Sequence, residues 1–224
     1  MAIVKAASGL ILAGWIAASA AQFPVRHEHL HHGCDGTMTA DENGVRFAGP
    51  KNHSWSWTYD DIQELRLEPH KIHLLTYADR RLRLGADHEY DFTGSVPASE
   101  LYQLWSRRMD QRFVAALSQP SISGFSVPVK HLKQISGSEG SLNFGPDSIV
   151  YSASAGDSRT WRYSDIESIS SSGPFQLTIT TFERARSHYG DRKGFNFELR
   201  EPITEARYND LWLQIERKNG RIQK

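Results

Sequence analysis

Histidines and the only cysteine of the chain lie close together near the N-terminus, in residues 27–34, HEHLHHGC. If this segment is one extended strand, His27, His29 and His31 point to the same face, because side chains alternate along a strand. Neutral imidazoles placed in this way could share a zinc or copper ion, with Cys34 as a further ligand. The segment therefore predicts a candidate metal site.

Other interpretations of the same segment stay open. A His-rich strand near a chain end can simply be solvated, and a histidine that titrates near its usual pKa can sense pH. If the segment does bind metal, Asp35 or His53 could complete the shell. Cys34 as a nucleophile would need an oriented base, whereas its neighbours on a strand point away from it.

Composition and motifs limit the other kinds of chemistry. The chain has 224 residues, with Lys+Arg 26 and Asp+Glu 26, for a formal net charge of +0. A neutral chain has no excess of basic residues to neutralise nucleic-acid phosphates. We find no Gly-x-Ser-x-Gly, Walker, His-Glu-x-x-His or dinucleotide-binding pattern. The sequence thus predicts a non-enzymatic protein that binds no nucleic acid and no cofactor, unless the histidines bind zinc or copper.

A duplicated motif indicates the elements that position these residues. The motif reads Trp57, Tyr59, Asp61, Ile62 and recurs 104 positions later as Trp161, Tyr163, Asp165, Ile166. His27 and His131 match at the same offset, which favours a shared structural role for these two histidines. A period of this size is that of a small domain. We expect the two aspartates to accept backbone N–H groups at a bend after the tyrosine.

Hydrophobic periodicity predicts several strands followed by one helix in each copy. The predicted strands of the first copy include one extended segment over 27–39, a turn at 41–44 and a Trp-rich strand over 54–59. A helix is predicted from Pro97, with apolar positions continuing to Leu117, and a second helix from Thr204. The predicted domains are residues 23–117 and 125–220, joined by a linker over 118–124.

The tryptophans differ in what their positions indicate. Trp57, Trp161, Trp105 and Trp212 lie at strand or helix spacings typical of core packing. Trp55 has Arg159 at the matching position of the second copy. Trp55 is therefore the candidate for a contact with a ligand or partner.

The N-terminal residues predict export. Residues 1–22 contain one lysine, Lys5, and an apolar stretch that ends in the small residues 18–21, ASAA. This pattern is typical of a signal peptide, and its length also allows a retained membrane anchor. We expect the remainder of the protein to be periplasmic or extracellular, either free or tethered by this segment.

The duplicated Trp-x-Tyr-x-Asp-Ile strand and the closing Trp-bearing helices resemble the pleckstrin-homology-like (PH-like) domains, including the GRAM branch. The resemblance implies two tandem bent antiparallel barrels, each closed by a C-terminal helix. Phosphoinositide-binding members carry a basic cluster at the first hairpin, where this chain has Asp41-Glu42-Asn43 and, in the second copy, Pro146-Asp147-Ser148. The implied function is a binding or scaffolding module for a protein at the cell envelope, without phosphoinositide binding. The alternatives are the metal-binding protein above and a lipid-binding envelope protein.

Overall fold

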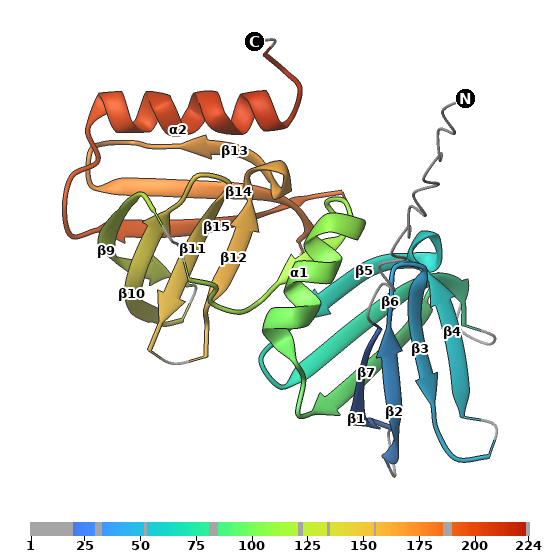
Figure 1. The fold of residues 1–224 in the computed structure, drawn as a ribbon. Helices are drawn as coiled ribbons and strands as arrows, with labels where there is room; N and C mark the ends of the chain where they lie inside the picture. The colour runs from blue at the N-terminus through green and yellow to red at the C-terminus, as the bar shows by residue number, and fades with distance from the viewer. Residues whose placement is uncertain are drawn as a thin grey trace, which may run out of the picture.

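The computed structural model describes residues 20–29, 33–51, 53–80, 85–120, 123–133, 135–154, 156–185 and 190–222. The protein is mainly β, with two α-helices (Figure 1). We call residues 20–117 the first half and residues 123–222 the second half. The predicted leader lies outside the described residues, except for its last three positions. Neither α-helix of the described part is long and apolar enough to cross a membrane.

The first half forms a run of antiparallel strands, one helix and a short final strand. Its elements are β1 (Ala21–His27), β2 (Cys34–Ala40), β3 (Gly44–Ala48), β4 (Ser54–Thr58), the 3-10 turn η1 (Tyr59–Asp61), β5 (Ile62–Leu67), β6 (Lys71–Asp79), β7 (Asp87–Gly94), α1 (Ala98–Arg108) and β8 (Phe113–Ala115).

The second half repeats this order up to its own helix. Its elements are β9 (Phe125–Leu132), β10 (Gly137–Phe144), β11 (Ser148–Ala153), β12 (Arg159–Arg162), the 3-10 turn η2 (Tyr163–Asp165), β13 (Ile166–Ser170), β14 (Gln176–Arg184), β15 (Arg192–Leu199) and α2 (Glu205–Lys218).

The strands of the described residues belong to one open sheet of 15 strands. The order β4-β3-β2-β1-β7-β6-β5 occurs in the first half, and β12-β11-β10-β9-β15-β14-β13 repeats it in the second. Strand β8 joins the halves, pairing parallel with β5 and antiparallel with β12. The prediction of two closed barrels is therefore wrong. The turns η1 and η2 lead the chain from one strand to the next without pairing them, so each run of strands stays open, and β8 links the two runs.

Each half has its own cluster of buried apolar side chains. One cluster contains residues from Ala21 to Leu117, and the other contains residues from Val127 to Ile215. The buried positions follow the two-residue period of a strand, as in β14, where Leu177, Ile179 and Thr181 are buried. Burial of alternate side chains against these two cores is the main stabilising contribution to each half.

Several predicted elements differ from the structure in their extent. Residues 27–39 are not one strand but parts of the hairpin β1–β2, in which His27 pairs with Cys34. Helix α1 ends at Arg108, and Phe113 lies in β8, because pairing with β5 and β12 supplies the backbone hydrogen bonds that a longer helix would have made. The alternation over residues 127–135 predicts one strand, but β9 ends at Leu132, and Ile135 is 99% exposed.

Helix α2 corrects the prediction for its tryptophan. Trp105 of α1 is fully buried, but Trp212 of α2 is 40% exposed, and Leu211 and Ile215 occupy the buried positions of this helix. The apolar stripe of an amphipathic helix is narrow, so a shift of one position decides which side chain is buried. The predicted N-cap, Thr204, accepts a hydrogen bond from the backbone N–H of Arg207.

The turn between β2 and β3 forms where it was expected, at residues 41–44. The Asp41 carboxylate accepts hydrogen bonds from the N–H groups of Asn43 and Gly44. Gly44 is needed here for close approach rather than for positive φ, because a Cβ atom at this position would lie 2.0 Å from the carbonyl oxygen of Trp57.

Candidate functional site

The hairpin β1–β2 brings three potential metal ligands together, which we call the histidine–cysteine cluster: His27, His29 and Cys34. One ligand atom from each lies within 4.8 Å of the others. The Sγ atom of Cys34 lies 3.5 Å from Nε2 of His29. The convergence arises because His27 and Cys34 face each other across the hairpin, and not because alternate residues of one strand share a face. His31 lies outside the described residues.

His27 is buried, and one of its ring nitrogens has no hydrogen-bond partner among the described residues. The residue is 5% exposed, and this nitrogen is Nδ1. Its ring lies against Trp55 and Phe92, with centroid distances of 5.0 and 5.1 Å. Burial, together with the charges of His29 and His53, lowers the pKa of His27 to about 4. With this lowered pKa the imidazole is uncharged at neutral pH. Its unpaired Nδ1 atom costs about 1–3 kcal/mol, as does any buried polar group without a hydrogen-bond partner.

Cys34 and His53 complete the surroundings of His27. Burial raises the pKa of the Cys34 thiol, which is the opposite of what an activated nucleophile needs. His53 precedes β4, and its ring centroid lies 5.1 Å from that of His29. The arrangement is therefore better suited to binding a ligand than to nucleophilic chemistry.

The second half contains a satisfied cluster at the matching place, which we call the Asp157 cluster: His131, Lys133, Ser138 and Asp157. The Oδ2 atom of Asp157 lies 3.1 Å from Nδ1 of His131 and 2.8 Å from Nζ of Lys133. It also accepts a hydrogen bond of 2.7 Å from the Ser138 hydroxyl. One carboxylate oxygen thus holds an imidazole, an ammonium group and a hydroxyl together.

These contacts explain the titration behaviour of the Asp157 cluster. Burial alone would raise the pKa of Asp157, but hydrogen bonds from Lys133, Ser138 and His131 bring it down to about 2. Burial lowers the pKa of His131, partly offset by Asp157. The Ser138 hydroxyl bonds the carboxylate itself rather than the imidazole, so the group lacks the order of contacts of a serine-hydrolase triad.

The two clusters occupy equivalent positions, residue by residue. At the offset of 104, His27, His29, Cys34 and His53 match His131, Lys133, Ser138 and Asp157. The strand register agrees, because His27 pairs with Cys34 as His131 pairs with Ser138. Sequence reasoning recognised the shared histidine but missed Asp157. The available signal was that the residue matching His53 is a carboxylate.

Trp55, the candidate contact residue, is half-buried beside the histidine–cysteine cluster. Its ring stacks near Trp57 and His53, with centroid distances of 6.3 and 5.8 Å. The matching Arg159 has a different environment: it lies 3.6 Å from the buried carboxylate of Glu183 and over the ring of Phe195. The first half is thus aromatic where the second half is ionic.

The repeated aspartates fix the two 3-10 turns. Asp61 accepts hydrogen bonds from the backbone N–H and the hydroxyl of Thr58, at 2.8 and 2.7 Å. Asp165 accepts one from the backbone N–H of Arg162, at 2.9 Å. A carboxylate used in this way shapes the turn.

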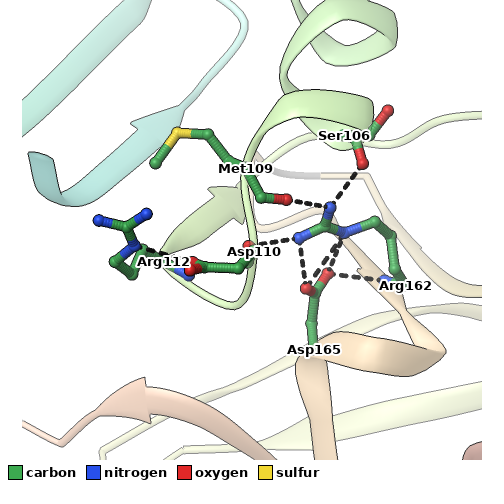
Figure 2. Close-up of polar contacts among 6 residues, drawn as sticks. All are labelled: Ser106, Met109, Asp110, Arg112, Arg162 and Asp165. Carbon is green, nitrogen blue, oxygen red and sulfur yellow. Dashed lines mark hydrogen bonds and ion pairs between the residues drawn. The ribbon is translucent and has the colours of Figure 1, made fainter. Parts of the chain in front are cut away.

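Arg162 connects the halves, as Figure 2 shows. Its guanidinium donates to the carbonyl oxygens of Ser106, Met109 and Asp110, at 2.6, 2.8 and 2.6 Å, and to the carboxylate of Asp165. These carbonyls belong to the end of α1 and the residues after it, where helix carbonyls lack partners within the helix. The matching residue of the first half is Thr58. This difference within the repeated motif was the sequence signal that Arg162 has a role of its own.

A groove lies between the halves. It has a volume of about 400 Å³ and is lined by residues 63–64, 75, 111–112 and 114 of the first half and residues 182–184 and 190–192 of the second. The lining carries charges of both signs, including Glu64, Arg112 and Glu183. A groove of this composition can bind a polar or zwitterionic surface, but it is not an apolar cleft.

Comparisons with known proteins give little further guidance. No protein-family model matches the chain, and no curated protein matches it. Its fold is similar to one chain of the "Structure of the Spt16D Pob3N heterodimer", at 10% sequence identity and a TM-score of 0.33, covering 73% of this chain and 84% of that chain. A similarity this weak carries no argument about function.

Proposed function

We propose that the protein is a non-enzymatic binding module of two tandem PH-like domains at the cell envelope, and that it binds an extended segment of a partner protein along the edge of β4. The repeated strand order and the two separate cores support the tandem arrangement. The predicted leader supports export. One observation carries the mode of binding: the edge that matches β4 in the second half already has a strand on it.

Strand β12 of the second half pairs with β8 through Thr160 and Ala115. The Thr160 hydroxyl also donates to the carbonyl of Leu117, at 2.8 Å. Strand β8 thus covers the edge of β12. Ser56 of β4 matches Thr160, but β4 ends the sheet (Figure 1).

The backbone of Ser56 faces away from β3. The N–H of Thr58 donates to Asp61 rather than to β3, and alternate residues of a strand direct their backbone groups to the same side. Ser54 and Ser56 therefore direct their N–H and C=O groups outward, and Thr58 directs its C=O group outward while its N–H is bound to Asp61. An unpaired row of this kind accepts an added strand, with pockets for alternate side chains providing specificity.

The opposite end of the sheet is less open to pairing. Strand β13 has three carbonyl oxygens bonded by side chains of α2 and the residues after it: Tyr208 bonds Ile169, Asn219 bonds Ile166, and Arg221 bonds Glu167. The edge of β4 is therefore the better docking surface. The groove between the halves gives the lipid-binding alternative little support, because half of the residues that line it are charged.

A photo-crosslinking amino acid at Ser54, introduced in cells that make the protein, tests this function. We expect it to link to a discrete partner protein, whereas the same amino acid at Ser170 on β13 should not. The substitution S56P should abolish the link, because proline lacks the outward N–H of an edge strand. If the link survives S56P, partner binding does not use this edge.

Two further measurements complete the test. Light scattering of the purified protein shows whether a second copy of the chain is the occupant, which would appear as a dimer that S56P dissociates. Mass measurement of the protein from the envelope fraction tests export and shows where the leader is cut. A full-length mass in the cytoplasm would contradict the envelope location without affecting the edge.

A further inference from the structure

We infer that His27, His29, Cys34 and His53 form a binding site for a zinc ion. The site is independent of strand addition at β4, although His53 directly precedes that strand. The first three residues already place their ligand atoms within 4.8 Å of one another. His53, whose ring lies 5.1 Å from that of His29, is our candidate for the fourth ligand.

One pair of ligands in the cluster already has the spacing found in tetrahedral zinc sites. Zinc binds thiolate sulfur at about 2.3 Å and imidazole nitrogen at about 2.0 Å, so two such ligands lie about 3.5 Å apart. The Sγ atom of Cys34 lies 3.5 Å from Nε2 of His29. No movement of this pair is needed to receive the ion.

The buried imidazole provides a second, independent observation. Nδ1 of His27 has no hydrogen-bond partner among the described residues, and the side chain is 95% buried among aromatic rings. Buried polar atoms are nearly always paired. A metal ion bound between His27, His29 and Cys34 would pair this one.

The second half shows what is missing from the first. There, one anion, the Asp157 carboxylate, is contacted by the three groups His131, Lys133 and Ser138. In the first half the carboxylate is replaced by an imidazole, and the ammonium group and the hydroxyl are replaced by an imidazole and a thiol. A set of lone-pair donors is held together by a cation, as a set of hydrogen-bond donors is held together by an anion.

The ligand set defines the class of ion. Imidazole and thiolate ligands favour zinc or copper(I) over magnesium and calcium, which prefer oxygen. Three histidines and one cysteine, one of them buried, suit the closed tetrahedral shell of zinc. This ligand set therefore favours zinc, with copper(I) as the nearest competitor.

The first experiment titrates the purified, chelator-treated protein with zinc chloride and, separately, with cobalt chloride. We expect one equivalent of zinc bound with micromolar or tighter affinity, and a thiolate-to-cobalt charge-transfer band. C34S should remove the band and weaken zinc binding at least about tenfold, since even changes outside the ligand shell reach that size. H70A, which replaces an exposed histidine outside the cluster, is the control and should change nothing.

The second experiment exchanges the ligand sets of the halves. The variant H29K/C34S/H53D gives the first half the residues of the Asp157 cluster, so it should stay folded by circular dichroism and lose zinc binding. The reciprocal change in the second half should raise the stoichiometry from one zinc ion to two. That variant is K133H/S138C/D157H.

Three results would overturn the proposal. These are no uptake of zinc by the unmodified protein, a preference for copper(I) over zinc in competition, or unchanged zinc binding in H29K/C34S/H53D. In the last case H31A/H32A should remove binding instead, which would assign the ion to residues 31–32.

Discussion

The first and second halves have the same strand order and register, but the buried histidine that they share has different partners in each half. In the second half, Asp157 satisfies a buried histidine and its neighbours through hydrogen bonds. In the first half, the matching histidine is left with an unpaired nitrogen beside a thiol and a second imidazole. The same histidine position is thus compatible with a hydrogen-bonded carboxylate in one half and with a set of potential metal ligands in the other. The first half is therefore free to carry a function that the second lacks.

The strands β4 and β12, which occupy equivalent edges of the two halves, differ in whether another strand pairs with them. Strand β12 is covered by β8, whereas β4 ends the sheet. Two arginines of the second half also make contacts within the protein: Arg162 bonds the end of α1, and Arg159 lies beside Glu183. The matching residues of the first half are Thr58 and Trp55, which leave its surface available. Both of the proposed binding sites, the edge of β4 and the histidine–cysteine cluster, therefore lie in the first half.

The largest difference is expected between the helix tryptophans. W105A should lower the free energy of unfolding by about 3–5 kcal/mol, because it empties a fully buried position. W212A should cost less than about 1 kcal/mol, because Trp212 is 40% exposed. Urea denaturation measures both. Equal losses would mean that α2 is packed by its tryptophan in solution.

The next largest loss of stability is expected for Arg162, which connects the two halves. R162A should cost about 2–4 kcal/mol, because it leaves the Asp165 carboxylate and the carbonyls of Ser106, Met109 and Asp110 without their donor. T58A, at the matching position, removes one exposed hydrogen bond to Asp61 and should cost about 0.5–1 kcal/mol. Similar values for the two variants in urea denaturation would contradict the assigned role of Arg162.

Proline substitutions should distinguish the two edges. T160P removes the pairing with β8 and the hydroxyl bond to Leu117, and should cost about 2–3 kcal/mol. S56P removes only an outward N–H group and should cost less than about 1 kcal/mol. Thermal unfolding followed by circular dichroism measures the pair. A large loss for S56P would show that the edge of β4 is already occupied within the protein.

The smallest effect is expected at Asp157, and it depends on pH. The folded pKa of Asp157 is about 2, below its usual value, so its contribution is present above that usual value and is lost as pH falls from about 4 to about 2. D157N should therefore cost about 1–2 kcal/mol at pH 6, a figure reduced for partial exposure, and almost nothing at pH 2.

H53A is the matched control for D157N, measured with chelator present. The His53 side chain is exposed, and the backbone hydrogen bonds that His53 makes with Gly49 and Pro50 do not depend on it, so H53A should change the free energy of unfolding by less than about 0.5 kcal/mol. A pH-independent cost for D157N in urea denaturation would mean that Asp157 acts by packing and not through its charge.

The sequence by itself determined the elements that depend on local pattern. Alternation predicted most strands, the Asp41 turn and the Thr204 cap, because these rest on contacts between residues close in the chain. The offset of 104 positions also identified His27 and His131 as equivalent. The sequence also identified His27 and Cys34 as candidate ligands, but the predicted single strand would have kept them apart, and only the hairpin β1–β2 pairs them.

Only the tertiary structure decided how distant residues meet. It opened the expected barrels into one sheet, moved Phe113 from a helix into β8, and left Trp212 partly exposed although it was expected in the core. It also joined Asp157 to His131 and Arg162 to the end of α1. A local pattern could not predict these outcomes, because each depends on the free energy of pairing or burial against a partner far along the chain, and that partner's position is set only when the whole chain has folded.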